Sequence, residues 1–573
     1  MEILLVASAF NSLTQRVYAE LSDRRHRVEV VLAAHGDDEV RRAVRDVRPD
    51  LVVAPILRTA LPKDVWAEHT CLVVHPGPPG DRGPSSLDWA IAGGATRWGV
   101  TVLQAEEDMD AGPVWASVPF DVVPAGKSDL YRNEVADAAV AAVLLAVERY
   151  AGGTYEPRPQ DDDPDADVTW RPAVRQEQRR IDWDTDTTAT VLRKLRAADS
   201  RPGVLDELCG AEVFLHGGHP EDRLRGSPGE LLATRTGAVC RATRDGAVWI
   251  PELRARRRPG GPPTFRLPAT HVLGPRRLAG VPEAPVAPEL AAGRRTWSDI
   301  HYRQDHDVGF LRFSFPGGAM STDQCRRLLD AYRHALTRPT RVLVLGGARD
   351  FFSNGIHLNV IEAATDPAAE SWANLNAMDD LVEAVLRTTD RLVVAALAGN
   401  AAAGGVMLAL AADQVWCRAG AVLNPHYRRM GLYGSEFWTY TLPHRAGPAT
   451  TERLMTEALP VSAATAVRLG LADRLVTASP QDFAAETERL AAQLARSPDL
   501  DRAVTAKQAR RARHEADRPL DDHRRAELAE MHRIFFDPHA PYHALRSAFV
   551  RKEAGGPPRP LTAPRALRAT RRP

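Results

Sequence analysis

The sequence predicts an α/β protein with an open α/β sheet domain, a small β-barrel domain and a second α/β domain with helices at its C-terminal end. Three observations carry this prediction. The chain has 573 residues, which at roughly 150 residues per domain is too long for one core. Hydrophobic residues make up 44% and charged residues 26%, as in folded globular proteins. Short apolar runs alternate with helical patterns in two separate stretches, which is typical of α/β sheets.

Residues 1–160 carry the first of these stretches. Apolar runs of strand length lie at 3–7, 28–32, 50–54, 72–75 and 99–103, with helical patterns between them. No G-x-G-x-x-G follows the first run, and we find no G-x-x-x-x-G-K sequence. A dinucleotide-binding domain is therefore disfavoured, and a P-loop is excluded.

Residues 165–254 predict the small β-barrel. A helical pattern at 187–197 precedes strand-like runs at 212–215, 238–243 and 247–250, which glycines separate. An acidic stretch at 161–165 marks the boundary with the first domain. Residues 255–295 are rich in Arg, Pro and Gly, and they predict a surface linker.

Residues 296–545 predict the second α/β domain, with strands at 308–315, 341–346 and 392–396. Residues 392–412 are apolar enough to suggest a membrane span, which needs about 20 residues. Gly399-Asn400 and Gly404-Gly405 interrupt this run, so a buried strand, a turn and a buried helix are favoured instead. The basic, Pro-rich residues 555–573 predict a disordered tail.

Charge and cysteine content narrow the class of partner. Lys+Arg and Asp+Glu are 74 each, so the formal net charge is zero, and nothing steers the protein to nucleic acid or to a membrane surface. The five cysteines lie far apart without a C-x-x-C pair, and we predict no metal site. The N-terminus shows no signal peptide. We therefore expect small-molecule substrates and a cytoplasmic location.

A candidate acid/base pair lies at one end of the first sheet. His75 ends the run 72–75 and precedes a Gly- and Pro-rich loop, and Asp110 lies in an acidic loop after the next strand. Ligands of open α/β sheets bind at such strand ends, and a carboxylate can orient or charge an imidazole. Taken alone, a histidine and a turn aspartate fit a structural role equally well.

The same stretch resembles the folate-dependent formyltransferases, whose motif reads N-x-H, then R-G-x-x-P, then D-x-G about 35 residues on. Here His75 is followed by Arg82-Gly83 and, at 110 − 75 = 35, by Asp110. The loop at 52–57, with Ile56 and Leu57, resembles the family's pterin-binding loop, and residues 165–253 resemble its C-terminal barrel. The resemblance implies 10-formyltetrahydrofolate as formyl donor and His75 and Asp110 as catalytic residues.

One departure from that family affects the chemistry. The family's asparagine, two residues before the histidine, is Val73 here. That amide helps to hold the formyl oxygen, and one lost oxyanion donor can cost ~100-fold or more in rate. A more reactive acceptor, such as a thiol, or a substitute donor would compensate for this loss.

Two glycine turns in the second α/β domain form another candidate site. The segments Ser353-Asn354-Gly355-Ile356 and Gly399-Asn400 to Gly404-Gly405 can aim backbone N–H groups at one oxygen. With residues 460–473, they resemble the enoyl-CoA hydratase/isomerase (crotonase) superfamily. By that resemblance the N–H groups of Ile356 and Gly404 hold a thioester oxygen, Gly355 and Gly405 shape the site, and coenzyme A is the carrier.

The two acid/base glutamates of the hydratases are absent from this sequence. Met407 and His426 stand near the expected positions, so addition of water to an enoyl-CoA is not expected. Polar groups cluster instead on the facing wall, where Tyr427, Tyr433 and Glu436 are candidates for the proton transfer. Glu436 alternatively fits a first-turn helix carboxylate, and both tyrosines alternatively fit a packing role.

The order of the two halves resembles a family of hydrogenase maturation factors. The residues that carry this resemblance are 75–91, 130–135, 353–359 and 424–436. It implies CO synthesis for a [NiFe] hydrogenase: formyl passes from 10-formyltetrahydrofolate to coenzyme A, and formyl-CoA then releases CO. Maturation proteins or the hydrogenase large subunit are possible partners. The alternatives are formyl transfer to an amine beside a separate acyl-CoA activity, and a folate- and CoA-binding scaffold.

Overall fold

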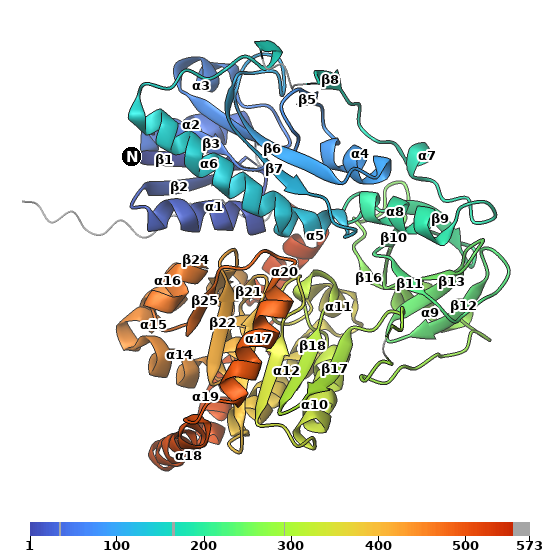
Figure 1. Cartoon of the computed structure of the whole chain (residues 1–573), viewed down its shortest axis with the longest axis vertical. Coiled ribbons are helices and arrows are strands. Elements are labelled where there is room, and N and C mark those ends of the chain that lie inside the picture. Colours follow the sequence, from blue (N-terminus) through green and yellow to red (C-terminus); the bar gives the residue numbers. More distant parts are fainter. Residues whose placement is uncertain (34–35, 163–166, 292, 554–573) are drawn as a thin grey trace, which may run out of the picture.

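The computed structural model describes residues 1–33, 36–162, 167–291 and 293–553. Figure 1 shows the two α/β domains one above the other, with the β-barrel domain beside both. The predicted fold class is confirmed. The tail predicted at 555–573 lies outside the described residues.

The first domain is a six-stranded sheet in the order β2-β1-β3-β4-β6-β7. Strands β1 to β4 are parallel, whereas β6 and β7 are antiparallel to their neighbours. All five predicted strands are present, but β7 was missed because its exposed residues break the apolar run. The strands are β1 (Glu2–Ala7), β2 (Arg27–Leu32), β3 (Leu51–Ala54), β4 (Cys71–His75), β6 (Arg97–Gln104) and β7 (Val114–Asp121).

Helices cover this sheet and complete its core. The Ala- and Val-rich helix α6 buries one continuous face against β6 and β7, which is how an amphipathic helix joins a sheet. The helices are α1 (Ser12–Asp23), α2 (Asp37–Val47), α3 (Lys63–Glu68), α4 (Ser86–Gly93), α5 (Lys127–Arg132) and α6 (Glu134–Gly152).

The barrel domain consists of two four-stranded sheets, β16-β15-β10-β9 and β11-β14-β13-β12. Its predicted helix is α8 (Thr188–Ala198), and the short α7 (Gln176–Arg179) precedes it. The strands are β9 (Val204–Leu208), β10 (Ala211–His216), β11 (His219–Glu221), β12 (Leu231–Arg235), β13 (Ala238–Ala242), β14 (Ala247–Ile250), β15 (Glu252–Ala255) and β16 (Leu267–Pro268).

The segment 255–295 is more ordered than the predicted linker. It contains β16 and helix α9 (Ala269–Arg277), and Leu273 of α9 is buried in the barrel core. Gly274 has a positive φ of 73° and Pro275 follows it inside the helix. These two residues interrupt the helical periodicity, which explains why the sequence predicted a surface connector.

The second α/β domain has a six-stranded sheet, β17-β18-β19-β20-β22-β25, and a small sheet, β21-β23-β24. The strands are β17 (Ile300–Asp305), β18 (Val308–Phe313), β19 (Val342–Gly346), β20 (Leu392–Leu397), β21 (Ala401–Ala402), β22 (Gln414–Arg418), β23 (Val422–Asn424), β24 (Val461–Ser462) and β25 (Arg474–Val476). The main helices are α10 (Thr322–Leu336), α11 (Leu358–Ala363), α12 (Pro367–Arg387), α13 (Gly404–Leu410), α14 (Trp438–Ala446), α15 (Pro448–Glu457), α16 (Ala463–Arg468), α17 (Phe483–Ala495), α18 (Leu500–Asp517), α19 (Leu520–Phe536) and α20 (Pro541–Arg551).

The apolar stretch 392–412 forms strand β20, a turn with β21, and helix α13, as predicted. Every residue of β20 and α13 is buried. Among the described residues, no helix is both long and apolar enough to cross a membrane.

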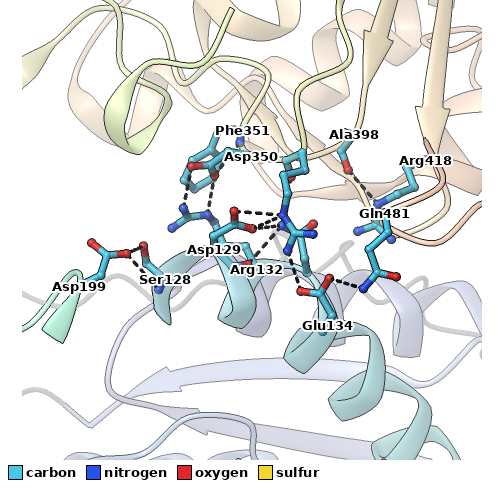
Figure 2. Close-up of polar contacts among 12 residues, drawn as sticks. Ser128, Asp129, Arg132, Glu134, Asp199, Asp350, Phe351, Ala398, Arg418 and Gln481 are labelled. Carbon is cyan, nitrogen blue, oxygen red and sulfur yellow. Dashed lines mark hydrogen bonds and ion pairs between the residues drawn. The ribbon is translucent and has the colours of Figure 1, made fainter. Parts of the chain in front are cut away.

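Ion pairs join the two α/β domains at the junction of α5 and α6, which Figure 2 shows. Arg132 donates two hydrogen bonds to Asp350, at 2.7 and 2.8 Å. Arg349 donates to both carboxylate oxygens of Asp129, at 2.9 and 3.0 Å, and to Glu134 at 2.7 Å. The segment 130–135 that marked the maturation-factor resemblance is therefore a domain contact.

A second set of contacts extends this interface. Asp137 of α6 accepts from Arg418 of β22 at 3.0 Å and also pairs with Arg16 of α1. Asp23, the last residue of α1, accepts from the Ser462 hydroxyl at 2.5 Å. Helix α1 thereby lies against the β23–β24 edge of the second domain.

We expect Arg349→Met to loosen this interface, because it leaves Asp129 and Glu134 without their shared cation. The loss should be roughly 1 to 3 kcal/mol, between the values for exposed and buried pairs. Urea unfolding and limited proteolysis would measure it, with Arg525→Met at an exposed arginine as control. Equal urea midpoints for the two variants would contradict the importance of this contact.

Candidate active sites

His75 lies at the end of β4 between two carboxylates. Its Nδ1 is 3.4 Å from Asp110 Oδ1, and its Nε2 is 2.9 Å from Asp81 Oδ2. The imidazole is 4% exposed. The structure therefore brings together the predicted pair His75 and Asp110 and adds a second carboxylate, Asp81, that the sequence did not indicate.

Asp110 is held by the loops around it. Its backbone has a positive φ of 58°, and its carbonyl oxygen accepts from the Gln160 side chain at 2.9 Å. Its Oδ2 accepts from the Gly83 N–H at 3.2 Å. A Cβ on Gly83 would overlap the carbonyl oxygen of Arg171, so the predicted Arg82-Gly83 element needs glycine for close packing.

Asp81 connects His75 to a cation from a distant segment. Strand β5 (Asp81–Arg82) pairs in parallel with β8 (Thr169–Trp170), and this pairing brings Arg171 into an ion pair with Asp81. A Cβ on Gly77 would overlap the Asp81 carboxylate. From the sequence, Asp81 fits an ordinary turn residue, and Arg171 is too far along the chain to be linked with it.

The two carboxylates decide the charge of His75. Burial opposes the imidazolium, but the hydrogen bonds and charges of Asp110 and Asp81 outweigh it and raise the pKa of His75 to about 9. At neutral pH the ring is therefore a cation paired with both carboxylates. Burial also acts to raise the pKa of Asp81, yet the contacts with His75, Ser86 and Arg171 lower it.

Other contacts fix the remaining residues considered for the folate site. Val73 and Leu57 both pack against the same hydrophobic core, and the Val73 side chain offers no hydrogen-bond donor. The Ile56 carbonyl accepts from the Ser8 N–H at 3.0 Å, which fixes the loop after β3. The Arg82 guanidinium lies 3.4 Å from Asp161.

The two glycine turns of the second domain meet as predicted. A Cβ on Gly355 would lie 3.2 Å from the Gly404 nitrogen, and a Cβ on Gly405 would overlap the Ser353 carbonyl. Within the described chain, neither the Ile356 N–H nor the Gly404 N–H has a hydrogen-bond partner. Two free donors beside each other are what an oxyanion site requires.

The Glu436 carboxyl lies directly against this site. A Cβ on Gly404 would overlap Glu436 Oε1, and the Tyr427 hydroxyl donates to Glu436 Oε2 at 2.7 Å. Glu436 is 1% exposed. Burial, and then the charge of Asp379, raise the pKa of Glu436 to about 8, while the Tyr427 hydrogen bond acts in the opposite direction.

Tyr433 does not join Tyr427 and Glu436. It is 39% exposed, and its ring packs 5.3 Å from the Trp438 ring. Gly434, between Tyr433 and Glu436, has a positive φ of 97°. A role of Tyr433 in proton transfer therefore stays a prediction.

Two other predicted positions are occupied by groups without a free acid/base function. Met407 is buried in the core. His426 has its Nδ1 2.9 Å from the Asn424 carbonyl, and burial lowers its pKa. Sequence reasoning missed the buried carboxylates Asp379 and Glu527, which contact the turn that carries Glu436.

Basic side chains gather where the three domains meet. Burial, and then Arg201 and Arg266, lower the pKa of the Lys552 ammonium to about 8. Burial, and then Arg58 and Arg266, lower the pKa of Arg201. In the described ranges, Arg58, Arg201 and Lys552 form no ion pair, so this cluster can hold the phosphates of a cofactor. No group of three or more metal-ligating side chains was found in the same ranges.

Comparisons with known proteins divide the chain as the fold does. Residues 31–147 match the Formyl transferase family, residues 173–260 match Formyl transferase, C-terminal domain, and residues 312–542 match Enoyl-CoA hydratase/isomerase. The methionyl-tRNA formyltransferase of Stenotrophomonas maltophilia is 31% identical over 231 residues, which cover 39% of this chain and 73% of that protein. The fold and its two sites therefore define a formyltransferase joined to an enoyl-CoA hydratase/isomerase-like domain.

Two relatives match nearly the whole chain. The hydrogenase maturation factor HoxX of Bradyrhizobium diazoefficiens is 48% identical over 554 residues, covering 96% of this chain and 95% of that protein. The crystal structure of HypX from Aquifex aeolicus in complex with tetrahydrofolic acid is 44% identical, covers 97% of this chain and 98% of that chain, and has a TM-score of 0.92. This chain belongs to the family of hydrogenase maturation factors that includes HoxX and HypX.

We expect Asp81→Asn to lower the pKa of His75, because the variant loses one of the two charges that raise it. NMR titration of the His75 ring, assigned with His75→Gln, would measure the shift. Since the folded pKa of His75 lies above the unfolded value of about 6.5, its ion pairs stabilise the fold fully below pH ~6.5. This contribution is lost as the pH rises through about 9.

The destabilisation by Asp81→Asn should accordingly be larger at pH 6 than at pH 10. Asp161→Asn is the control, because its carboxylate is exposed and pairs with Arg82 rather than His75. An unchanged His75 titration in Asp81→Asn would show that Asp81 does not set the charge of this ring.

Proposed function

We propose that this protein makes CO for hydrogenase maturation in two steps. The first transfers formyl from 10-formyltetrahydrofolate to the thiol of coenzyme A. The second splits formyl-CoA into CO and coenzyme A. The observation that carries the proposal is the buried Glu436 carboxyl, which lies against the Gly404 oxyanion donor in a domain without the hydratase glutamates.

In the first step, the carbon–sulfur bond forms as the bond between the formyl carbon and the folate nitrogen breaks, and the thiol proton ends on that nitrogen. The His75 imidazolium replaces the missing amide at Val73, because a cation held by two carboxylates can donate to the developing oxyanion. Asp110 and Asp81 keep the ring charged and oriented. Displacement of either carboxylate by the formyl group would free one N–H donor.

In the second step, the N–H groups of Ile356 and Gly404 hold the thioester oxygen of formyl-CoA. Glu436 removes the proton from the formyl carbon, the carbon–sulfur bond breaks, and CO leaves. The same carboxyl then returns the proton to the thiolate, so coenzyme A is regenerated. Tyr427 holds Glu436 through its hydroxyl. A raised pKa makes a carboxylate a better base and suits it to both transfers.

The binding of coenzyme A is supported by the basic cluster of Arg58, Arg201, Arg266 and Lys552. These residues come from the two parts of the formyltransferase half and from the end of α20, and their charges act on one another. Folate binding is supported by the tetrahydrofolic acid of the Aquifex aeolicus HypX complex. A maturation protein or the hydrogenase large subunit would be the acceptor of the CO.

We expect His75→Ala to abolish formyl transfer while leaving the second site intact. The variant should release no tetrahydrofolate from 10-formyltetrahydrofolate and coenzyme A, but it should still form CO from supplied formyl-CoA. His539→Ala, at an exposed histidine, is the control. Substantial folate turnover by His75→Ala would contradict the assigned role. Turnover that needs an added amine instead of coenzyme A would contradict the proposed acceptor.

We expect Glu436→Gln to lower CO release from formyl-CoA by ~100-fold or more, the usual range for lost acid/base catalysis. Formyl-CoA or formate should accumulate, because the first site is unchanged. Gas-phase detection of CO and chromatography of CoA esters would measure both products. Glu530→Gln on α19 is the control, because that carboxylate is exposed. Normal CO release by Glu436→Gln would place the base elsewhere.

A further inference from the structure

The turn that carries Glu436 has an unfavourable backbone conformation. Glu436 and Phe437 have φ values of 60° and 62°, and non-glycine residues adopt this left-handed region only at a cost in free energy. Such a conformation persists only where surrounding contacts enforce it. The residues that enforce it here come from two other helices.

Asp379 of α12 holds the first half of the turn. Its Oδ1 accepts from the Glu436 N–H at 2.8 Å, and its Oδ2 accepts from the Ser435 hydroxyl at 2.9 Å. Asp379 is fully buried. Hydrogen bonds from a carboxylate to a backbone N–H are stronger than neutral ones, so this contact fixes the backbone at the residue whose side chain reaches Gly404.

Glu527 of α19 holds the second half of the turn. Its Oε2 accepts from the Phe437 N–H at 2.8 Å, and its Oε1 accepts from the Thr439 N–H at 2.8 Å and from the Thr439 hydroxyl at 2.5 Å. Glu527 is also fully buried. The backbone N–H groups of Glu436, Phe437 and Thr439 therefore all donate to a buried carboxylate on another helix.

We propose that Asp379 and Glu527 are positioning residues that hold the Ser435–Thr439 turn so that the Glu436 carboxyl stays against Gly404. They act through the turn and do not reach the thioester themselves. This inference rests on the proposed function of Glu436 and extends it, because it assigns two residues from other helices to the same reaction.

The charges around Glu436 support this assignment. Burial comes first among the causes that raise the pKa of Asp379 to about 7 and of Glu527 to about 8. Several groups face the three carboxyl groups of Glu436, Asp379 and Glu527. They are the Tyr427 hydroxyl, the Cys325 thiol of α10, Asp380, the Arg524 guanidinium, and His523 beside Thr439. Arg524 pairs with Asp380 and Glu383 rather than with these three carboxylates. Arg524 still acts on Asp379 through its charge and lowers the pKa of that carboxyl against the effect of burial, whereas Asp379 and Glu527 both raise the pKa of Glu436.

Asp379→Asn tests the proposal because it keeps the shape of the side chain and removes its charge. Glu436 should then lose its proton at a lower pH, so the acid limb of kcat for CO release from formyl-CoA should move down by about one pH unit or more. The looser turn should lower the plateau kcat about 10-fold or more. KM should stay unchanged, since Asp379 does not contact the substrate. Glu527→Gln should act in the same direction.

Glu530→Gln is the matched control, because it makes the same change as Glu527→Gln three residues further along α19, where the carboxylate is exposed. It should keep the wild-type pH profile. A variant that only weakened the fold would lower the thermal midpoint and the active fraction without moving the acid limb. Such a result for both Asp379→Asn and Glu527→Gln would overturn the proposal.

Infrared titration separates this proposal from the proposed function. The protonated carboxyl band of Glu436, identified by its loss in Glu436→Gln, should titrate near pH 8 in the wild type and at a lower pH in Asp379→Asn. This shift does not depend on whether formyl-CoA is the substrate. Failure of the wild type to release CO would refute the proposed function, whereas an unshifted band in Asp379→Asn would refute the positioning role.

Discussion

The ion pairs between the α5–α6 junction and the Arg349–Asp350 turn hold the two halves of this protein as one body. The first domain contributes the charged side chains of Asp129, Arg132 and Glu134. The second domain contributes their partners, Arg349 and Asp350. Burial and the neighbouring Asp350 raise the pKa of Asp129, which shows that the carboxylates would repel one another without the arginines. Because each partly buried charge needs its partner in this arrangement, the ion pairs specify how the two domains dock.

Both sites place buried carboxylates around one central residue, but with opposite effects on its charge: they favour charged His75 in the first site and neutral Glu436 in the second. In the first, Asp81 and Asp110 surround His75 and favour its cation, and Arg171 keeps Asp81 ionised. In the second, burial and then the charges of Asp379 and Glu527 favour the neutral form of Glu436. A charged donor suits a site that must hold an oxyanion. A carboxyl that gains and loses its proton near neutral pH suits a site that must move one.

The sequence predicted those parts of the sites that lie within single strand–loop motifs. His75, Asp110, Ile356 and Gly404 follow buried strands, so local pattern and spacing located them. Asp379 and Glu527 lie in the interior of long amphipathic helices, where an acidic residue is ordinarily exposed, and only the tertiary fold brings them to the Ser435–Thr439 turn. The Asp81–Arg171 pair depends on the pairing of β5 with β8 across 90 residues.

The position of Glu436 also limits the size of the acyl group. Its carboxyl fills the space that a side chain on Gly404 would occupy, and the Met378 methyl lies 3.1 Å from the same point. An acyl chain extending from the thioester carbon in this direction would meet the carboxyl or Met378, whereas a formyl group presents only a hydrogen atom there. If Glu436 is the proposed base, the turn that places its carboxyl against Gly404 would also leave little room for a longer acyl group on that side. This geometry is a second argument, besides the missing hydratase glutamates, for the proposal that formyl-CoA rather than an enoyl-CoA is the substrate.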